Sequence, residues 1–201
     1  AIVDVVGMPA LEHAVVEVRP GSGGLAPAAV SLLDERDDAR ATCWLPLALV
    51  DFSHRHHPKN RGTPPTLASN PVLRGVRVLQ EGRSVRGDWL VDTGSAVTIL
   101  STEAAHALGL SDPAPLSAPV GGISGSQKAL QGWRVDRIEL TTTTGGIVAL
   151  TDAAVFVHDV STTTDDGTRI TLDGIFGANL LDAFARVVID VPRARLGVDT
   201  R

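Results

Sequence analysis

The feature that most limits the fold of this chain is a series of aliphatic segments after residue 71, each bounded by turn-forming residues. The segments are rich in Val, Leu, Ile and Thr, and they have the lengths and spacing of strands. Aromatic residues make up 3% of the chain and Tyr is absent, so we expect an aliphatic core. The pattern predicts an all-β domain, with strands at residues 72–79, 86–92, 96–100, 130–140, 146–159 and 185–191.

Two short helices are expected between these strands. Ser101 can cap a helix over residues 102–108, and Gly109 lies just past its end. A further turn or two of helix is expected at residues 179–184. Neither helix is long enough to organise the fold.

The N-terminal third of the sequence is less regular than the rest. Its segments are shorter, and Pro, Gly and charged residues interrupt them more often. The expected elements are, in order, a short strand, a turn at Gly7 and one or two helical turns within residues 1–13, a strand at 14–18, an irregular Gly/Pro-rich segment at 20–28, a brief helix or charged loop at 32–40, a strand at 42–52 interrupted by Pro46, and an exposed loop at 53–71.

Two segments of the sequence resemble each other. Residues 4–20 and 173–192 both read as Asp, two apolar residues, Gly, an apolar helical turn and a Val-rich strand ending in Pro. Aligning Gly7 with Gly177 needs a short gap before the Val pairs, and chance similarity is the alternative. The resemblance predicts three parts, namely the tail of an upstream repeat at 1–20, a linker at 21–71 with one strand at 42–52, and a main domain at 72–201.

Charge, cysteine content and hydropathy exclude several classes of function. The net charge is −5 and no dense Lys/Arg cluster occurs, which argues against a nucleic-acid partner. The single cysteine, Cys43, excludes an internal disulfide, and we expect it to be a small buried residue. No apolar run reaches the roughly 18 residues of a membrane-spanning helix, so we expect a soluble chain, secreted and periplasmic locations included. Because Ala1 opens an apolar segment, we expect an upstream continuation.

The stretch WLVDTGSAVTILS, residues 89–101, places one carboxylate between two apolar runs. Gly94 permits close backbone approach and the Thr93 hydroxyl can bond a matching loop, so the triplet predicts a tight loop that holds Asp92 rigidly. Two such carboxylates facing each other share a proton, and one then acts as a base on water while the other acts as an acid. This chemistry hydrolyses peptide bonds without a metal or a covalent intermediate.

Further motifs follow in order and resemble those of the retropepsin-like aspartic proteases. The segment around Asp92 resembles the active-site segment of that family, and VGGISG at 120–125 resembles its flap. DGIFGANLL at 173–181 resembles the second signature, and VVIDVPRARLGV at 187–198 the closing strands. The resemblance implies an all-β, retropepsin-like acid protease β-barrel lobe with two short helices, and a catalytic domain over residues 72–201.

The resemblance also implies a role for individual residues. Asp92 becomes the catalytic residue, Gly177 is structural, and no cofactor is expected. The supporting loop consists of Thr93, Gly94 and Ser95, with Ser95 hydrogen-bonded beside the carboxylate. The flap, which holds an extended peptide as an added strand, consists of Gly121, Gly122, Ile123, Ser124 and Gly125. Because pepsin-like flaps carry a Tyr, its absence favours the retroviral and bacterial branch.

The implied activity is that of an aspartic endopeptidase on peptide or protein substrates, and it requires a second Asp. The chain contains one Asp-Thr-Gly, so the second Asp comes either from a homodimer mate or from another lobe, an upstream repeat or associated fragment of the same protein. The resemblance between residues 4–20 and 173–192 favours the upstream repeat. A non-catalytic module that binds peptides or self-associates is the alternative, although it has no chemical need for the intact motif at residues 92–95.

One other cluster of side chains was considered as a site. His54, His56 and His57 follow Asp51 and have donor atoms suited to zinc or nickel. Their segment shows no fixed ligand geometry. We therefore expect a solvated loop and no metal site.

Overall fold

The structure is a computed structural model, and it describes residues 14–21, 29–34, 40–51, 69–111, 113–121, 127–163 and 169–201. Within these residues the chain is mostly β. The strands are β1 (Ala14–Arg19), β2 (Ala29–Asp34), β3 (Cys43–Asp51), β4 (Ser69–Gln80), β5 (Arg83–Val91), β6 (Ile99–Leu100), β7 (Leu116–Gly121), β8 (Gln127–Thr141), β9 (Ile147–Val157), β10 (Ser161–Thr163), β11 (Arg169–Thr171), β12 (Gly174–Phe176), β13 (Phe184–Asp190) and β14 (Arg195–Thr200). The helices are α1 (Thr102–Leu108) and α2 (Ala178–Leu181).

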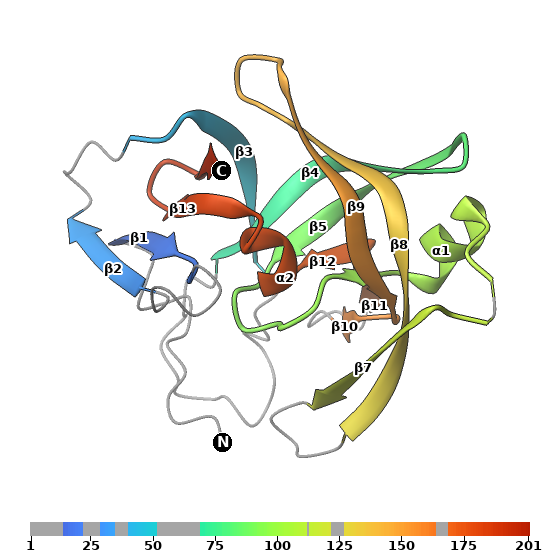
Figure 1. The fold of residues 1–201 in the computed structure, drawn as a ribbon. Coiled ribbons are helices and arrows are strands. Elements are labelled where there is room, and N and C mark those ends of the chain that lie inside the picture. Colours follow the sequence, from blue (N-terminus) through green and yellow to red (C-terminus); the bar gives the residue numbers. More distant parts are fainter. Residues whose placement is uncertain are drawn as a thin grey trace.

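A closed barrel forms the larger part of the molecule. Twelve strands make one sheet in the order β2-β1-β13-β14-β3-β4-β5-β12-β6-β9-β8-β7. An additional pairing of β4 with β8 closes six of these strands into a barrel, in the order β4-β5-β12-β6-β9-β8. The long β8–β9 hairpin lies along one side of the barrel (Figure 1). The expected all-β barrel with two short helices is therefore confirmed.

The core of the barrel is aliphatic, as the composition predicts. Val and Leu dominate the main cluster of buried residues, which runs from the barrel into β13 and β14. One aromatic pair joins β5 to β12, since Trp89 and Phe176 lie with ring centroids 6.5 Å apart. Alternate residues of β5 point into this core, which fixes the direction of the chain as it enters residue 92.

The two helices lie close to their expected positions. In α1, the Ser101 hydroxyl accepts a hydrogen bond from the Ala104 amide at 3.3 Å, and Gly109 ends the helix with φ 76°, as predicted. Helix α2 ends at Leu181, earlier than expected. The reason is that a turn at residues 182–183 brings Phe184, which is 1% exposed, into the core as the first residue of β13.

Several expected boundaries differ because strand pairing overrides local sequence. Residues 32–34, expected as a helix or charged loop, belong to β2 because they pair with β1. Strand β3 is not interrupted at Pro46, because β3 changes partner there from β14 to β4 and a missing amide is tolerated. Strand β4 begins at Ser69, so residues 69–71, which were expected in the loop at 53–71, belong to the strand. Strand β6 is only Ile99–Leu100.

Other expectations fall wholly or partly on residues outside the described part of the chain. These are the elements within residues 1–13, the segment 22–28, residues 35–39, and the loop from 52 to 68. The expected division into three parts stays a prediction. Strands from both sides of its boundary at residue 72 share one sheet, since β3 pairs with β4 and with β14.

Candidate active site

Asp92 directly follows β5, at the point where β5, β12 and β6 lie side by side in the sheet. Strand β12 lies between β5 and β6, with Phe176 opposite Val91 in a parallel pair and Ile175 opposite Ile99 in an antiparallel pair. The Asp92 amide donates to the Phe176 carbonyl at 3.1 Å, which continues the parallel ladder by one residue. The loop 92–98 therefore starts from a position fixed by the sheet.

Two backbone hydrogen bonds shape the loop around the Asp92 side chain. The Gly94 amide donates to Asp92 Oδ1 at 2.9 Å, and the Ser95 amide donates to the Asp92 carbonyl at 3.2 Å. The Ser95 hydroxyl donates to the Val97 carbonyl at 2.8 Å, so it stabilises the loop backbone rather than the carboxylate. The Asp92 carboxylate is thus oriented through one oxygen by a backbone amide.

The start of α2 contacts the loop 92–98 and holds it in place. The Ala178 amide donates to the Ser95 carbonyl at 2.8 Å. Gly177 lies so close to the loop that an added Cβ would be 2.3 Å from the Val97 carbonyl oxygen. Only a glycine fits this close approach, which agrees with the structural role expected for Gly177.

A polar pair that sequence reasoning missed links the loop to the barrel. The Thr98 hydroxyl, in a fully buried residue, accepts from the Gly177 amide at 3.1 Å and donates to Asn179 Oδ1 at 2.8 Å. The Asn179 amide nitrogen in turn donates to the Ala154 carbonyl of β9 at 2.9 Å. Two features of the sequence could have indicated this pair. Thr98 is the one hydroxyl residue in the apolar run 96–100, and Asn179 is an amide residue two positions after Gly177.

The opposite side of the loop is open. Asp92 is half-buried, and Thr93 and Gly94 are exposed. Within the described ranges, no Lys, Arg or His forms an ion pair with Asp92. The Asp92 carboxylate thus has a fixed orientation and is accessible to a bound molecule or to a second carboxylate.

Of the expected flap, only its first residue is described. Gly121 ends β7 and lies opposite Gln127 of β8, and the two strands pair antiparallel over their common length. Gly122, Ile123, Ser124 and Gly125 lie outside the described residues, between these two strands in the sequence. The structure therefore shows the two strands that flank the expected flap in the sequence, and the flap itself stays a prediction.

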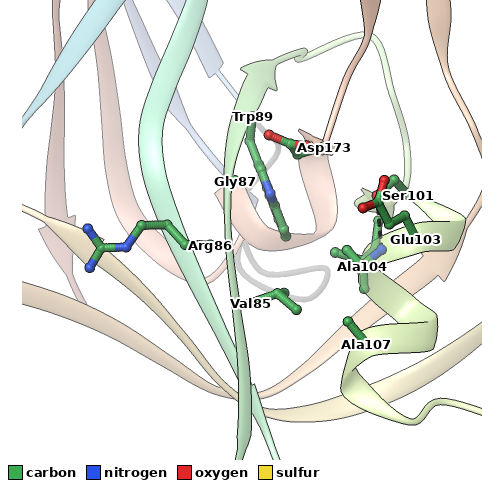
Figure 2. Close-up of a pocket in the computed structure, with 10 residues that line it drawn as sticks. Val85, Arg86, Gly87, Trp89, Ser101, Glu103, Ala104, Ala107 and Asp173 are labelled. Carbon is green, nitrogen blue, oxygen red and sulfur yellow. Dashed lines mark hydrogen bonds between the residues drawn. The ribbon is translucent and has the colours of Figure 1, made fainter.

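The pocket shown in Figure 2 is separate from Asp92. It has a volume of about 170 Å³ and lies between β5 and α1. Asp173 faces Gly87 there, and its carboxylate accepts from the Asp88 amide at 2.7 Å, which ties β5 to the segment before β12. The lining residues are Val85, Arg86, Gly87, Trp89, Leu100, Ser101, Glu103, Ala104, Ala107 and Asp173.

Two further expectations concern metals and membranes. His54, His56 and His57 lie outside the described residues, and the described part of the chain contains no group of His, Cys, Asp or Glu that could hold a metal ion. No described helix has both the length and the apolar character needed to cross a membrane.

Comparisons with known proteins identify the family. A search of curated proteins found no match. Solved structures that are similar include a retropepsin-like aspartic protease from Rickettsia conorii (12% identity, 81% of this chain and 95% of that chain covered, TM-score 0.43). They also include an aspartic proteinase from Irpex lacteus (16% identity, 93% of this chain and 56% of that chain covered, TM-score 0.48). A family model described as aspartyl protease matches residues 76–180, more than half of the chain, and the chain therefore belongs to the aspartyl protease family.

Proposed function

We infer that the protein is an aspartic endopeptidase in which Asp92 is one of two catalytic carboxylates. One observation carries the proposal: the loop that bears Asp92 is fixed by β12 and α2, while the carboxylate itself is half-buried and unpaired with a cation among the described residues. A structural carboxylate in the same molecule, Asp190, is instead fully buried and bound by arginines. The Asp92 side chain is therefore accessible to a substrate and to a second carboxylate.

The reaction uses the two carboxylates in complementary states. The ionised carboxylate removes a proton from a water molecule whose oxygen attacks the carbonyl carbon of the peptide. The protonated partner gives its proton to the carbonyl oxygen, and a tetrahedral diol forms. This diol collapses as its C–N bond breaks, the nitrogen takes up a proton, and the two carboxyl groups return to their starting states. The second carboxylate belongs to another lobe or subunit.

The remaining residues of the motif act on Asp92 and on the substrate. Gly94 orients the carboxylate through its amide, and Ser95 holds the loop by its hydrogen bonds to residues 97 and 178. The exposed hydroxyl of Thr93 is placed to meet a matching loop of the partner lobe. The glycine-rich segment 121–125, which lies between β7 and β8 in the sequence, binds the peptide substrate as an added strand.

The test compares peptide cleavage by the wild type with cleavage by the Asp92→Asn variant, at mildly acidic pH and in the native assembly. Asn has nearly the same shape but cannot serve as a base, so we expect cleavage to be lost. The matched control is Asp152→Asn, because Asp152 is exposed, and Asn tolerates its positive φ of 52°. Binding of a pepstatin-type transition-state mimic to the wild type is the second measurement.

Two outcomes would contradict the proposal. Equal cleavage by the wild type and Asp92→Asn would show that Asp92 takes no part in hydrolysis. Binding of extended peptides without any cleavage would favour the alternative of a non-catalytic peptide-binding module.

A further inference from the structure

Four strands on one side of the molecule have an internal two-fold relation. In the order β2-β1-β13-β14, the inner strands pair antiparallel, and each outer strand is the hairpin partner of its inner neighbour. The central pairs along β1 are Val15 with Asp190, Val16 with Ile189, and Glu17 with Val188. A two-fold axis through the middle pair exchanges Val15 with Val188 and Glu17 with Asp190.

The sequences of the two hairpins agree with this axis. It places Val-Val-Glu-Val, residues 15–18, on Val-Ile-Asp-Val, residues 188–191. On the outer strands it places Leu32, which lies opposite Val16, on Leu196, which lies opposite Ile189. The geometry and the sequence therefore relate the same positions, which extends the resemblance of residues 4–20 to 173–192.

Both of the equivalent acidic residues are buried and paired with arginine, although the arginines come from different positions. Glu17 is 8% exposed and Asp190 is 0% exposed. Glu17 forms an ion pair with Arg186 at 3.1 Å, and Asp190 forms one with Arg195 at 2.7 Å. Buried acids in strands are uncommon and need such partners, so their coincidence at matched positions indicates a true structural repeat.

The two hairpins differ in what covers them. Leu196 is 0% exposed in the core of the barrel lobe, whereas its equivalent Leu32 is 65% exposed. Val30, on the same face of β2 as Leu32, is 68% exposed. Between them, Val16 and Ile189 continue the same apolar row across the sheet. One end of this apolar face is thus covered by a lobe, and the equivalent end, on the edge strand, is bare.

We propose that the β1–β2 hairpin is the closing hairpin of a second retropepsin-like lobe, which covers Val30 and Leu32 as the barrel lobe covers Leu196. Because β13 and β14 follow the barrel strands of their lobe in the chain, β1 and β2 follow those of their own, N-terminal to the hairpin in the same polypeptide. This lobe supplies the carboxylate opposite Asp92, and that last step rests on the proposed function.

A second copy of the same chain fits this interface less well. In a symmetric dimer built on the closing strands, β13 of one copy would have to pair with β13 of the other. Here β1 occupies one edge of β13 and β14 occupies the other. The position that a dimer mate would need is therefore already filled by the chain itself.

The experiment measures the accessibility of Leu32 in the 201-residue chain and in the full-length polypeptide made by its natural host. The variant is Leu32→Cys on a Cys43→Ala background, and the matched control is Ile147→Cys, since Ile147 is 58% exposed at the far end of β9. In the 201-residue chain both thiols are expected to react with a maleimide at similar rates. In the full-length polypeptide the Leu32→Cys thiol alone is expected to react slower by about tenfold or more.

The mass of the full-length polypeptide, its cleavage activity and the oligomeric state of the short chain complete the test. Equal reactivity of the two thiols in the full-length polypeptide, or a natural polypeptide of only 21.0 kDa, would overturn the second lobe. Peptide cleavage by a homodimer of the 201-residue chain would overturn it too, while leaving the proposed function standing. Protection of Leu32→Cys without any cleavage would support the lobe and defeat the proposed function.

Discussion

Asp92 and Asp190 both lie at the end of an apolar strand, yet the molecule holds them in opposite ways. Asp190 is 0% exposed and is bound by Arg195 at 2.7 Å and Arg193 at 3.4 Å. Asp92 is half-buried, and its carboxylate accepts a hydrogen bond from the Gly94 amide. Asp190 is thus held by two guanidinium groups, whereas Asp92 is oriented by a backbone amide and pairs with no cation among the described residues. The first arrangement serves stability and the second suits chemistry.

The largest expected effect tests this contrast through activity. We expect Asp92→Asn to lower the rate of peptide cleavage by about 10³-fold, the scale of general acid–base catalysis. Its free energy of unfolding should stay within about 0.5 kcal/mol of wild type, because the substitution removes no buried contact. Single-turnover cleavage and urea denaturation measure the two quantities. An Asp92→Asn protein that is strongly destabilised would place Asp92 in the same class as Asp190.

The reverse result is expected at Asp190. Asp190→Ala should lower the free energy of unfolding by about 3 kcal/mol, because it leaves Arg195 and the backbone at the end of β13 without their buried partner. Urea denaturation with Asp182→Ala as the control, expected within about 0.5 kcal/mol of wild type because Asp182 is exposed and has φ −66°, measures this. The prediction fails if both substitutions have equally small effects.

Of the two carboxylates compared above, only Asp92 could be recognised from the sequence. Asp92 could be selected because Thr and Gly follow it and apolar runs flank it, and the strand pattern predicted the all-β domain around it. Helix α1 was predicted at its observed bounds because its cap and its terminal glycine are local signals. Asp190 gave no comparable signal, since its arginine partners are recognisable only once β13 and β14 have paired.

What sequence reasoning missed depends on contacts between distant residues. The Thr98–Asn179 hydrogen bond joins positions 81 residues apart, so no local pattern contains it. Residues 32–34 carry charged neighbours and were expected as a helix or loop, but pairing with β1 makes them a strand. Pro46 suggested an interruption of β3, which the change of strand partner at that position removes.

A substitution beneath the Asp92 loop sharpens the comparison from the structural side. Gly177→Ala would place a Cβ 2.3 Å from the Val97 carbonyl oxygen, so the loop must shift, at a cost of about 2 kcal/mol in unfolding free energy. Cleavage should fall as well, because the shift moves Asp92. The control is Gly146→Ala, whose Cβ would meet only the Thr142 hydroxyl at 3.2 Å. Similar behaviour of both variants would mean that α2 does not fix the loop.

The smallest expected effect concerns pH and a second structural carboxylate, that of Asp199 in β14. Burial raises the pKa of Asp199, but hydrogen bonds from Thr42 and Arg186 outweigh it, so the pKa is lowered from its ordinary value of 3.8. A lowered pKa in the folded state stabilises the protein above the unfolded value, and this stabilisation is lost as the pH falls through the folded pKa. Asp199 should therefore stay ionised at the mildly acidic pH that we propose for the cleavage assay.

Replacing Asp199 by Asn tests this. At pH 7 the variant should be less stable than wild type by about 1.5 kcal/mol, the scale of a hydrogen bond to a charged group, since Arg186 donates to Asp199 at 2.8 Å. The difference should persist down to about pH 5 and shrink below the unfolded pKa of 3.8, where protonated Asp199 in the wild type resembles Asn. Urea denaturation at a series of pH values measures it. A difference that is the same at neutral and strongly acidic pH would mean that packing, rather than charge, holds Asp199, and the contrast with Asp92 would then rest on Asp190 alone.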